Sequence, residues 1–398
     1  MQQAPAERCD ILIAGGGPVS LALAHALDAL NQGGQLKVMQ IGEAPPADDR
    51  PIALSWGSRV MLERMGCWDK LPVTPITRIH VSQQQAFGRT LICAADHAIE
   101  ALGYVVAYRD LVAALSSPSA AAPLQRSRVT EWAVQDDGVD VTHGAGTIKT
   151  QLLVLADGGT QGGGQADKVA GTGRESVKEY GQSAIVCAIE TEKPHDNTAW
   201  ERFSTEGPLA LLPFRDRYAL VWTSRTASAE RLMALDDQAF LAAAQKAFGG
   251  RRGAFRAAGR RAAFPLSLKH RHGGAQARVI PIGNAAQTLH PVAGQGLNLG
   301  LRDAWELAEL IADADRHGMD ASAASMPGSA AFAQAYARRR QLDRKALVRL
   351  TDGMISAFGL ELPFASAVRG AALAFLDAVP PARRFLSRRM MFGARALP

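Results

Sequence analysis

The sequence predicts an α/β fold: a Rossmann-like nucleotide-binding domain with an inserted antiparallel sheet and helices that follow. Three observations support this prediction. The apolar run 9–14 leads through a glycine turn into the alanine- and leucine-rich segment 19–30, as in a strand–turn–helix unit. Between about 175 and 270, short apolar segments alternate with turns rich in proline, glycine and charge, which is typical of antiparallel strands. From 279 the strand–loop–helix pattern returns, so the sheet is inserted between parts of one domain.

The first turn carries a phosphate-binding pattern. Gly15-x-Gly17-x-x-Ser20 approximates G-x-G-x-x-G, in which the first glycine makes the turn and the second admits a diphosphate. The third glycine normally lets the helix pack against the strand, and here a small serine takes its place. Pro18 ends the tight turn, directly before the predicted helix 19–30. The pattern therefore predicts a diphosphate contact at this helix N-terminus.

The second strand, 36–41, follows the first helix at βαβ spacing. A nucleotide-binding domain usually carries an acidic residue at the end of this strand, where it holds the ribose hydroxyls. That position is Gly42 in this chain, and Glu43 follows it. Either Glu43 makes the ribose contact after a small shift of the chain, or this contact is absent.

Two later apolar runs also end in glycine-rich loops. The run 151–156 leads into Asp157-Gly158, a second candidate nucleotide turn. The run 279–282 ends at Gly283-Asn284, and an amphipathic helix pattern opens near Leu301. The loop between them contains Gly294 and Gly296, which suit a backbone lying against a flat ring and a diphosphate. An ordinary glycine-rich connection is the alternative interpretation.

The size and composition favour a large domain with an insertion, or two interleaved domains. The chain has 398 residues, 47% of them hydrophobic. We expect nucleotide-binding parts at 1–75, 106–175 and 273–350, strands of the inserted domain at 76–105 and 176–272, and a helical tail at 351–398. The four cysteines, Cys9, Cys67, Cys93 and Cys187, are widely separated, which argues against a metal site or a disulfide framework.

The formal charge of +6 does not indicate nucleic acid, because the arginines concentrate late, at 338–340, 383–384 and 388–389. Such clusters among apolar residues fit an anionic membrane surface or an acidic partner, and a solvated helix face is the alternative. The sequence shows no secretory signal pattern and no apolar run of the roughly 20 residues that cross a bilayer. We therefore expect a cytoplasmic location, with peripheral contact at the inner membrane left open.

Blocks of residues along nearly the whole chain resemble, in order, the ubiquinone-biosynthesis hydroxylases, which are flavoprotein aromatic monooxygenases. The matching blocks are Gly15-Gly16-Gly17-Pro18-Val19, 49–58, Tyr108-Arg109-Asp110-Leu111, Asp157-Gly158, Tyr180-Gly181-Gln182, Trp200-Glu201-Arg202-Phe203, 207–213, 283–303, and Tyr336, Arg340 and Asp343 with 351–353. The resemblance implies an architecture like that of p-hydroxybenzoate hydroxylase.

The resemblance also implies the chemistry. NAD(P)H reduces a bound FAD, and oxygen from O₂ reaches the ring of a polyprenylated phenol through a flavin C4a-hydroperoxide. Membership of a ubiquinone-biosynthesis complex is a further implication. The positions that match the family's cofactor contacts, or that the turn patterns place beside them, are Gly15, Gly17, Pro18, Ser20, Glu43, Arg50, Arg109, Asp157, Gly283, Asn284, Pro291, Gly294, Gln295, Gly296, Leu297 and Asn298. No metal is implied.

Three features besides Gly42 depart from the family pattern. Asn284 stands where the family has aspartate, Gln287 where it has histidine, and 160–164 lack the usual serine and arginine. Two other functions therefore stay open: a non-catalytic scaffold, and a hydroxylase of another aromatic compound. Because the flavin carries the chemistry, no side chain is predicted to be catalytic, and His290 beside Pro291 is the histidine to test.

Overall fold

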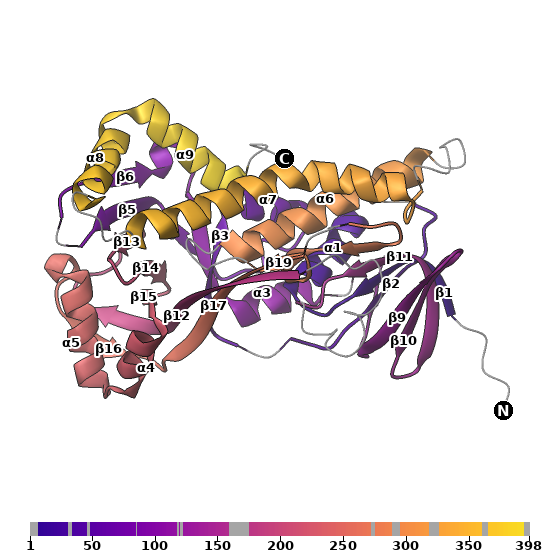
Figure 1. Ribbon diagram of the computed structural model, residues 1–398, viewed down its shortest axis with the longest axis horizontal. Helices are drawn as coiled ribbons and strands as arrows, with labels where there is room; N and C mark the ends of the chain where they lie inside the picture. The colour runs from indigo at the N-terminus through magenta and orange to yellow at the C-terminus, as the bar shows by residue number, and fades with distance from the viewer. Residues whose placement is uncertain are drawn as a thin grey trace.

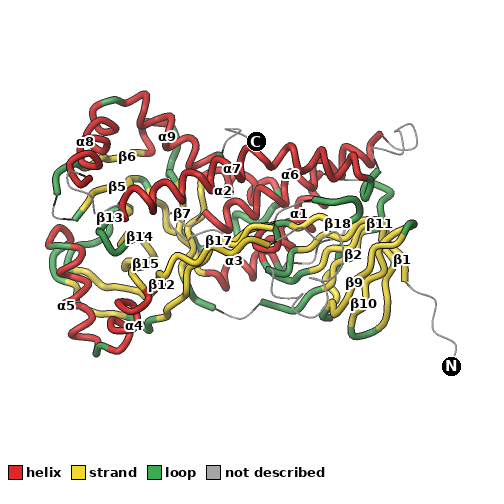
Figure 2. The backbone as a smooth tube through the Cα atoms, in the orientation of Figure 1, coloured by secondary structure: helices red, strands yellow, loops and turns green. Residues whose placement is uncertain are grey.

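The computed structural model describes residues 7–30, 34–45, 48–84, 86–117, 119, 122–158, 175–271, 275–288, 295–317, 326–359 and 365–393. Strands gather in two regions of an elongated molecule, and the long strands β12 and β17 run between them (Figure 1). Helices α6 and α7 extend along one side of this arrangement (Figure 2).

The first region contains what we call the core sheet. In the described part of the chain its strands follow the order β8 (Leu124–Gln125), β2 (Val38–Ile41), β1 (Glu7–Ala14), β11 (Gly146–Leu155), β10 (Gly138–His143) and β9 (Val129–Gln135), with β18 (Val279–Pro281) paired to β11. Strand β1 is parallel to β2 and β11, and β11 is parallel to β18. This is the parallel arrangement that the βαβ spacing predicts.

Period-two alternation gives the core sheet two buried faces. Ile11 and Ile13 pack on one side with residues of α1 (Pro18–Leu30) and α6 (Gln295–His317), whereas Leu12 faces the opposite cluster with Trp132 of β9. Helix α3 (Tyr108–Leu115) also packs on the first side. The sheet is thus covered on both faces, as parallel sheets require.

The second region contains the wall sheet. Among the described residues it runs in the order β19 (Gln287–Thr288), β17 (Ala262–Arg271), β12 (Glu175–Thr191), β15 (Arg217–Arg225), β14 (Pro208–Phe214), β13 (Thr198–Phe203), β5 (Arg78–Gln83) and β6 (Arg89–Cys93), and β16 (Phe255–Ala258) pairs with β12. Most pairs are antiparallel, as predicted, but β13 runs parallel to β5.

Two helices within the predicted all-strand segment correct the expectation from sequence. Helices α4 (Thr226–Ala234) and α5 (Asp237–Phe248) lie against the outer face of the wall sheet (Figure 1). Phe240, Ala244 and Phe248 recur at helical spacing and join the cluster formed by Leu211 and Leu220. The apolar outer face of the sheet is therefore covered, and its inner face is left for a cavity.

A third sheet joins the two regions. It consists of β3 (Pro51–Ser55), β7 (Gly103–Ala107) and β4 (Thr74–Ile76), and α2 (Trp56–Arg64) follows β3. The short 3₁₀ helices η1 (Ala94–His97), η3 (Gly250–Arg252) and η4 (Gly283–Ala285) form connections. Helices α7 (Ala330–Gly359), α8 (Ala365–Ala378) and α9 (Pro380–Phe392) follow, and α8 packs on β6 while α9 packs on α2 and β3.

Helix α6 begins earlier than the sequence pattern indicates. It is helical from Gln295, whereas the amphipathic pattern opens near Leu301. The early turns contain Gly296 and Gly300, which weaken the apolar signal. Gly300 packs against α1, because an added Cβ would lie 2.6 Å from a methyl carbon of Val19. Close helix packing therefore explains this glycine better than loop formation does.

Candidate cofactor and substrate site

The glycine turn after β1 is pressed between two other strands. A Cβ on Gly15 would lie 2.5 Å from the carbonyl oxygen of Ala156, and a Cβ on Gly42 would lie 2.2 Å from the carbonyl carbon of Gly15. By contrast, no described atom lies within 4 Å of an added Cβ at Gly17. The turn is thus tight on its inner side and open at the N-terminus of α1, where a diphosphate would bind.

Ser20 and Pro18 start helix α1. The Ser20 hydroxyl is fully buried and donates a hydrogen bond of 2.7 Å to the carbonyl oxygen of Gly17. Pro18 is the first residue of the helix, where its missing N–H costs no hydrogen bond. Serine in place of the third glycine therefore stabilises the turn from inside.

Glu43 follows Gly42 directly beside this turn. Its backbone touches Gly16, where an added Cβ would lie 2.0 Å from the Glu43 carbonyl oxygen. Its carboxylate is exposed and lies 3.2 Å from Nη2 of Arg128. The acidic side chain of Glu43 therefore stands one residue beyond the predicted ribose position and pairs with Arg128.

Arg50 and Arg109 are brought together at the start of β3 and α3. The Arg50 guanidinium lies 4.5 Å from the centre of the Tyr108 ring and its Nε lies 3.3 Å from Asp48. Nε of Arg109 lies 2.7 Å from Asp49. The two predicted arginines thus share one acidic loop, and Arg50 also lines the cavity described below.

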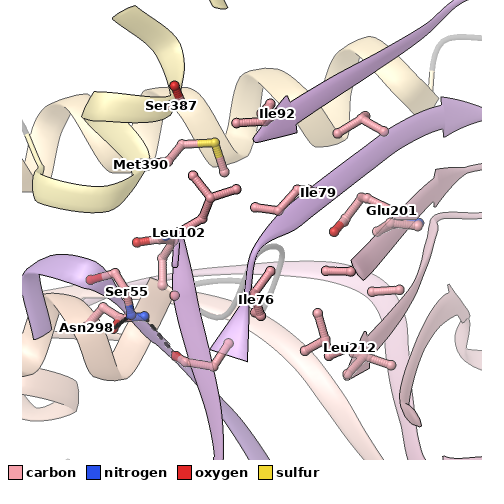
Figure 3. A pocket seen from close by; sticks show the side chains of 18 of the residues that line it. Ser55, Ile76, Ile79, Ile92, Leu102, Glu201, Leu212, Asn298, Ser387 and Met390 are labelled. Atoms are coloured by element: carbon pink, nitrogen blue, oxygen red, sulfur yellow. Dashed lines mark hydrogen bonds between the residues drawn. The ribbon is translucent and has the colours of Figure 1, made fainter. Parts of the chain in front are cut away.

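The start of α6 faces the end of β3. Asn298 is buried, and its Oδ1 accepts hydrogen bonds from the Ser55 backbone N–H at 2.8 Å and from the Ser58 hydroxyl at 2.6 Å. Its Nδ2 donates to the Ala53 carbonyl oxygen at 3.0 Å, a bond drawn in Figure 3. Asn298 therefore fixes the distance between the helix and β3.

Gln295 differs from Asn298 in that one of its side-chain polar atoms has no hydrogen-bond partner among the described residues. The side chain is 6% exposed, and its Oε1 is buried without a hydrogen-bond partner in the described part of the chain. Gln295 lines the cavity, as Asn298 does. Leu297 is half-buried, and an added Cβ at Gly296 meets no described atom within 4 Å.

The remaining predicted positions lie at the ends of core strands. Asp157 follows β11 and is half-buried, and Asn284 is exposed in η4. The Gly283 backbone N–H donates to Oδ2 of Asp303 at 3.1 Å, so that turn is anchored to α6. His290, Pro291, Gly294 and the loop 160–164 lie outside the described residues.

A cavity of about 680 Å³ lies between the wall sheet, β3 and helices α8 and α9. Its surface is almost entirely apolar (Figure 3). The wall sheet contributes residues such as Ala184, Val186, Ala210, Leu212 and Phe264, and the two helices contribute Leu373, Leu376, Leu386 and Met390. The end of the cavity that lies beside β3 and α6 is lined by Arg50, Gln295 and Asn298. The cavity therefore runs from the predicted flavin edge to the late helices.

One acidic residue, Glu201, stands among the described residues that line this cavity. Along β13, Trp200 faces the outer cluster, whereas Ala199, Glu201 and Phe203 face the cavity. Burial raises the pKa of the Glu201 carboxyl to about 7. The resemblance to the hydroxylase family includes the block 200–203 but implies no role for Glu201. A charged residue at an inward position of an alternating strand is the sequence signal that points to it.

The histidines within the described part of the chain do not line the cavity. His25 Nε2 lies 3.0 Å from the Leu115 carbonyl oxygen, and His195 Nε2 lies 2.8 Å from that of Arg215. Both contacts are to backbone groups of neighbouring elements, which gives these rings structural partners.

The residues present fit a dinucleotide such as FAD. No described atom lies within 4 Å of a Cβ added at Gly17, Gly158 or Gly296. The phosphates and the ring of the dinucleotide would lie beside these glycines. The apolar cavity adjoins this space at Gln295 and Asn298. A flat ring held there would have backbone N–H groups of the first turn of α6 beside it.

Comparison with known proteins agrees with this geometry. Residues 8–325 match the model of the FAD binding domain family. Ubiquinone hydroxylase UbiL of Rhodospirillum rubrum is 33% identical over 96% of this chain and 89% of its own length. The 3-demethoxyubiquinol 3-hydroxylase of Escherichia coli is 29% identical over 97% of this chain and 95% of its own length.

The fold is also that of solved flavin monooxygenases. The crystal structure of p-nitrophenol 4-monooxygenase PnpA from Pseudomonas putida covers 98% of this chain and 100% of its own, with a TM-score of 0.72 and 14% identity. At that identity the likeness shows the fold alone, and the family assignment comes from the sequence matches. The chain belongs to the FAD-binding-domain family and is an FAD-dependent aromatic monooxygenase related to the ubiquinone hydroxylases.

Proposed function

We propose that this enzyme hydroxylates the aromatic ring of a polyprenylated phenol in ubiquinone biosynthesis, using FAD, NAD(P)H and O₂. The observation that carries the proposal is the apolar cavity of about 680 Å³ that extends from the start of α6 to helices α8 and α9. Such a volume accommodates a ring and part of an isoprenoid tail. The two relatives compared above are named as a ubiquinone hydroxylase and a 3-demethoxyubiquinol 3-hydroxylase, and both names describe this type of reaction.

In this proposal the cofactor lies along the glycine turns. Gly15, Gly17 and Pro18 border the diphosphate at the N-terminus of α1, and Ser20 supports that turn from inside. Glu43, with Arg128, holds the ribose in place of an acidic residue at Gly42. The other proposed contacts are Arg50, Arg109, Asp157, Gly283, Asn284, Pro291, Gly294, Gln295, Gly296, Leu297 and Asn298.

The bound flavin would be reduced by NAD(P)H and would supply the oxygen that enters the ring. The protein's part is to hold the phenol beside the flavin edge and to keep water away. The apolar walls exclude water, and Leu376, Leu386 and Met390 would pack along the prenyl tail. A long apolar tail gains binding energy there in proportion to the area it buries.

The test measures cofactor and product separately. Purified protein is titrated with FAD, and bound flavin is followed by its absorbance after desalting. The holoenzyme is then given NAD(P)H, ¹⁸O₂ and phenols that carry tails of increasing length. We expect one flavin per chain, one ¹⁸O in the product ring, and a KM that falls with tail length. Flavin-free protein, or a product without ¹⁸O, would refute the proposal.

We further propose that α8 and α9 contact the membrane that holds the substrate. In the described part of the chain no helix is long and apolar enough to cross a bilayer. Yet Val368, Phe375 and Phe385 are 68%, 57% and 65% exposed on these two helices, whose inner sides line the cavity. Arg384 and Arg388 are also exposed on α9, and the Arg389 guanidinium lies 5.2 Å from the centre of the Phe385 ring. Apolar side chains among arginines suit an anionic bilayer surface.

Vesicle flotation tests this contact. The holoenzyme should float with vesicles that contain anionic lipid and much less with neutral vesicles. The triple variant Val368→Ser, Phe375→Ser, Phe385→Ser should lose most of this binding while it still hydroxylates a short-tailed phenol. Equal flotation of both proteins would overturn the membrane contact and favour a protein partner at this surface.

A further inference from the structure

We infer that Glu201 binds the ring hydroxyl of the phenol and accepts its proton as oxygen is transferred to the ring. This inference rests on the proposed function, because it needs a phenol in the cavity. It concerns a side chain of the wall sheet, on the opposite side of the cavity from Asn298 and Ser55 (Figure 3).

The strand places the carboxylate inside the cavity. Glu201 pairs with Ala210 of β14 on one side and with Val81 of β5 on the other, and both neighbours also line the cavity. Ala199 and Phe203, two residues away in each direction, face the same way. Small or apolar side chains thus surround the carboxylate on its own sheet, and its end points toward the open volume (Figure 3).

The cavity contains few other charges. Besides Glu201, the ionisable side chains among its described lining residues are Arg50 and Arg369. Arg50 lies beside Asp48, and Nε of Arg369 lies 3.5 Å from Oε1 of Gln83. The cavity-facing residues of β12, β14, β15 and α9 include no ionisable group. Burial alone accounts for the raised pKa of Glu201.

A carboxylate in this apolar cavity destabilises the fold unless a ligand forms a hydrogen bond with it. Burying an unpaired charge in apolar surroundings is strongly unfavourable, and a polar ligand that donates a hydrogen bond relieves the cost. The phenol O–H is such a donor. An aromatic substrate without a hydroxyl would leave the carboxylate unpaired, so Glu201 also selects for phenols.

The proton transfer balances within the known overall reaction. The phenol O–H bond breaks, its proton moves to a Glu201 carboxylate oxygen, and the electron pair stays on the ring oxygen. The electron-rich ring carbon then receives one oxygen atom of O₂. The second oxygen atom leaves as water, which takes two electrons and one hydrogen from NAD(P)H and one proton from solvent. The ring carbon loses its hydrogen as a proton to the new oxygen, which becomes a hydroxyl, and Glu201 returns its proton to the original ring oxygen. A base with a pKa near the working pH suits both transfers.

The main test compares Glu201→Gln with the control Glu190→Gln, whose side chain lies outside the cavity and pairs with Arg217. Both holoenzymes should bind FAD and, without phenol, be reduced by NAD(P)H at the wild-type rate. We expect Glu201→Gln to lower the kcat of hydroxylation by about 10²-fold or more. The wild-type kcat should rise through an apparent pKa near 7, and this limb should disappear in Glu201→Gln. Glu190→Gln should match the wild type.

Two further measurements separate proton acceptance from packing. Fluorinated phenols, which lose their proton more readily, should recover part of the Glu201→Gln rate, since less help from a base is needed. Infrared difference spectra of the resting holoenzyme should show a carboxyl band that titrates near pH 7 and is absent in Glu201→Gln.

The outcomes distinguish a failure of the proposed function from a failure of the role inferred for Glu201. If the wild type hydroxylates no phenol, the proposed function itself fails. If the wild type hydroxylates phenols and Glu201→Gln does so at the same rate, with the same pH profile, the proposed function stands and the role of Glu201 is wrong.

Discussion

Gly42 shows how a residue that departs from a motif can be required by backbone packing. The motif predicts an acidic residue that contacts the ribose at this position, and a glycine there removes that contact. In the structure an added Cβ would lie 2.2 Å from the Gly15 carbonyl carbon and 2.3 Å from the Gly16 nitrogen. The strand end therefore touches the turn directly, and the acidic side chain is displaced to Glu43.

Gly42→Ala should disturb this turn. The methyl group would push the end of β2 from Gly15, and overpacking of this kind costs about 1–3 kcal/mol. We expect the free energy of unfolding to fall by that amount in urea titrations and FAD affinity to fall by about tenfold, since 1.4 kcal/mol of lost binding corresponds to that factor.

Gly250→Ala is the matched control for this substitution. An added Cβ there meets no described atom within 4 Å, and the residue lies in η3, away from the turn. It should leave both FAD affinity and stability close to wild type. Wild-type FAD affinity in Gly42→Ala would contradict the proposed role of the close contact.

Local sequence can identify site residues but not their partners. Asn298 belongs to a block that resembles the flavin edge, yet its bonds go to Ser55, Ser58 and Ala53, which are more than 200 positions away. The role of Glu201 does not follow from local sequence, because it depends on a cavity that distant elements enclose. Residue types follow from the pattern, whereas their use depends on tertiary contacts.

At the scale of elements, buried charges fasten α7 to α6. Oδ1 of Asp303 lies 2.6 Å from Nε of Arg340, and Oδ2 lies 3.0 Å from Nη2 of Arg344. Oδ2 also accepts the Gly283 backbone N–H. Burial would raise the pKa of the Asp303 carboxyl, but Arg344 and Arg340 hold it below its ordinary value. One carboxylate thus links two helices and the turn after β18.

Arg340→Met should weaken this link, because it removes one of the two arginines that pair with Asp303. Loss of a partner from a buried ion pair typically costs about 3–5 kcal/mol. We expect a loss of that size in the free energy of unfolding at pH 7, measured by urea denaturation. Arg316→Gln, whose partner Asp313 is exposed, should cost less than about 1 kcal/mol.

The pH dependence gives a second check on the same link. Because the Asp303 pKa is lowered in the folded state, its contribution to stability is present above its unfolded pKa of about 4 and is lost as the pH falls below it. Arg340→Met weakens that shift, so the variant should lose less stability than the wild type on acidification. Equal losses in both proteins would show that Arg340 does not set the Asp303 pKa.

Elements with a strong local pattern could be predicted from the sequence. The parallel βαβ unit and the strands of the 175–270 segment follow from apolar runs between turns. Helices α4 and α5 do not follow from the turn-like spacing of this segment, and the recurrence of Phe240, Ala244 and Phe248 is the signal that indicates α5. The start of α6 does not follow from the amphipathic pattern, because Gly300 there serves helix packing.

At the scale of the molecule, the order of motifs predicts the fold class but not the cavity. The core sheet uses residues from 7 to 281, and the wall sheet includes β5 and β6, which precede all its other described strands in the chain. The cavity is then closed by α8 and α9, whose role as walls no local pattern reveals. Its enclosure depends on how these distant segments meet.

The parallel pairing of β5 with β13 has a consequence for how the protein acquires its fold. Arg78 and Thr198 are in register although they are 120 positions apart in the chain. Closing so long a loop costs entropy before any contact repays it, and such non-local pairings slow folding. The pairing of β5 with β13 is therefore expected to form late, after the local hairpin of β13 with β14. During refolding, hydroxylation activity, which needs the closed cavity, should return after most of the secondary structure has formed.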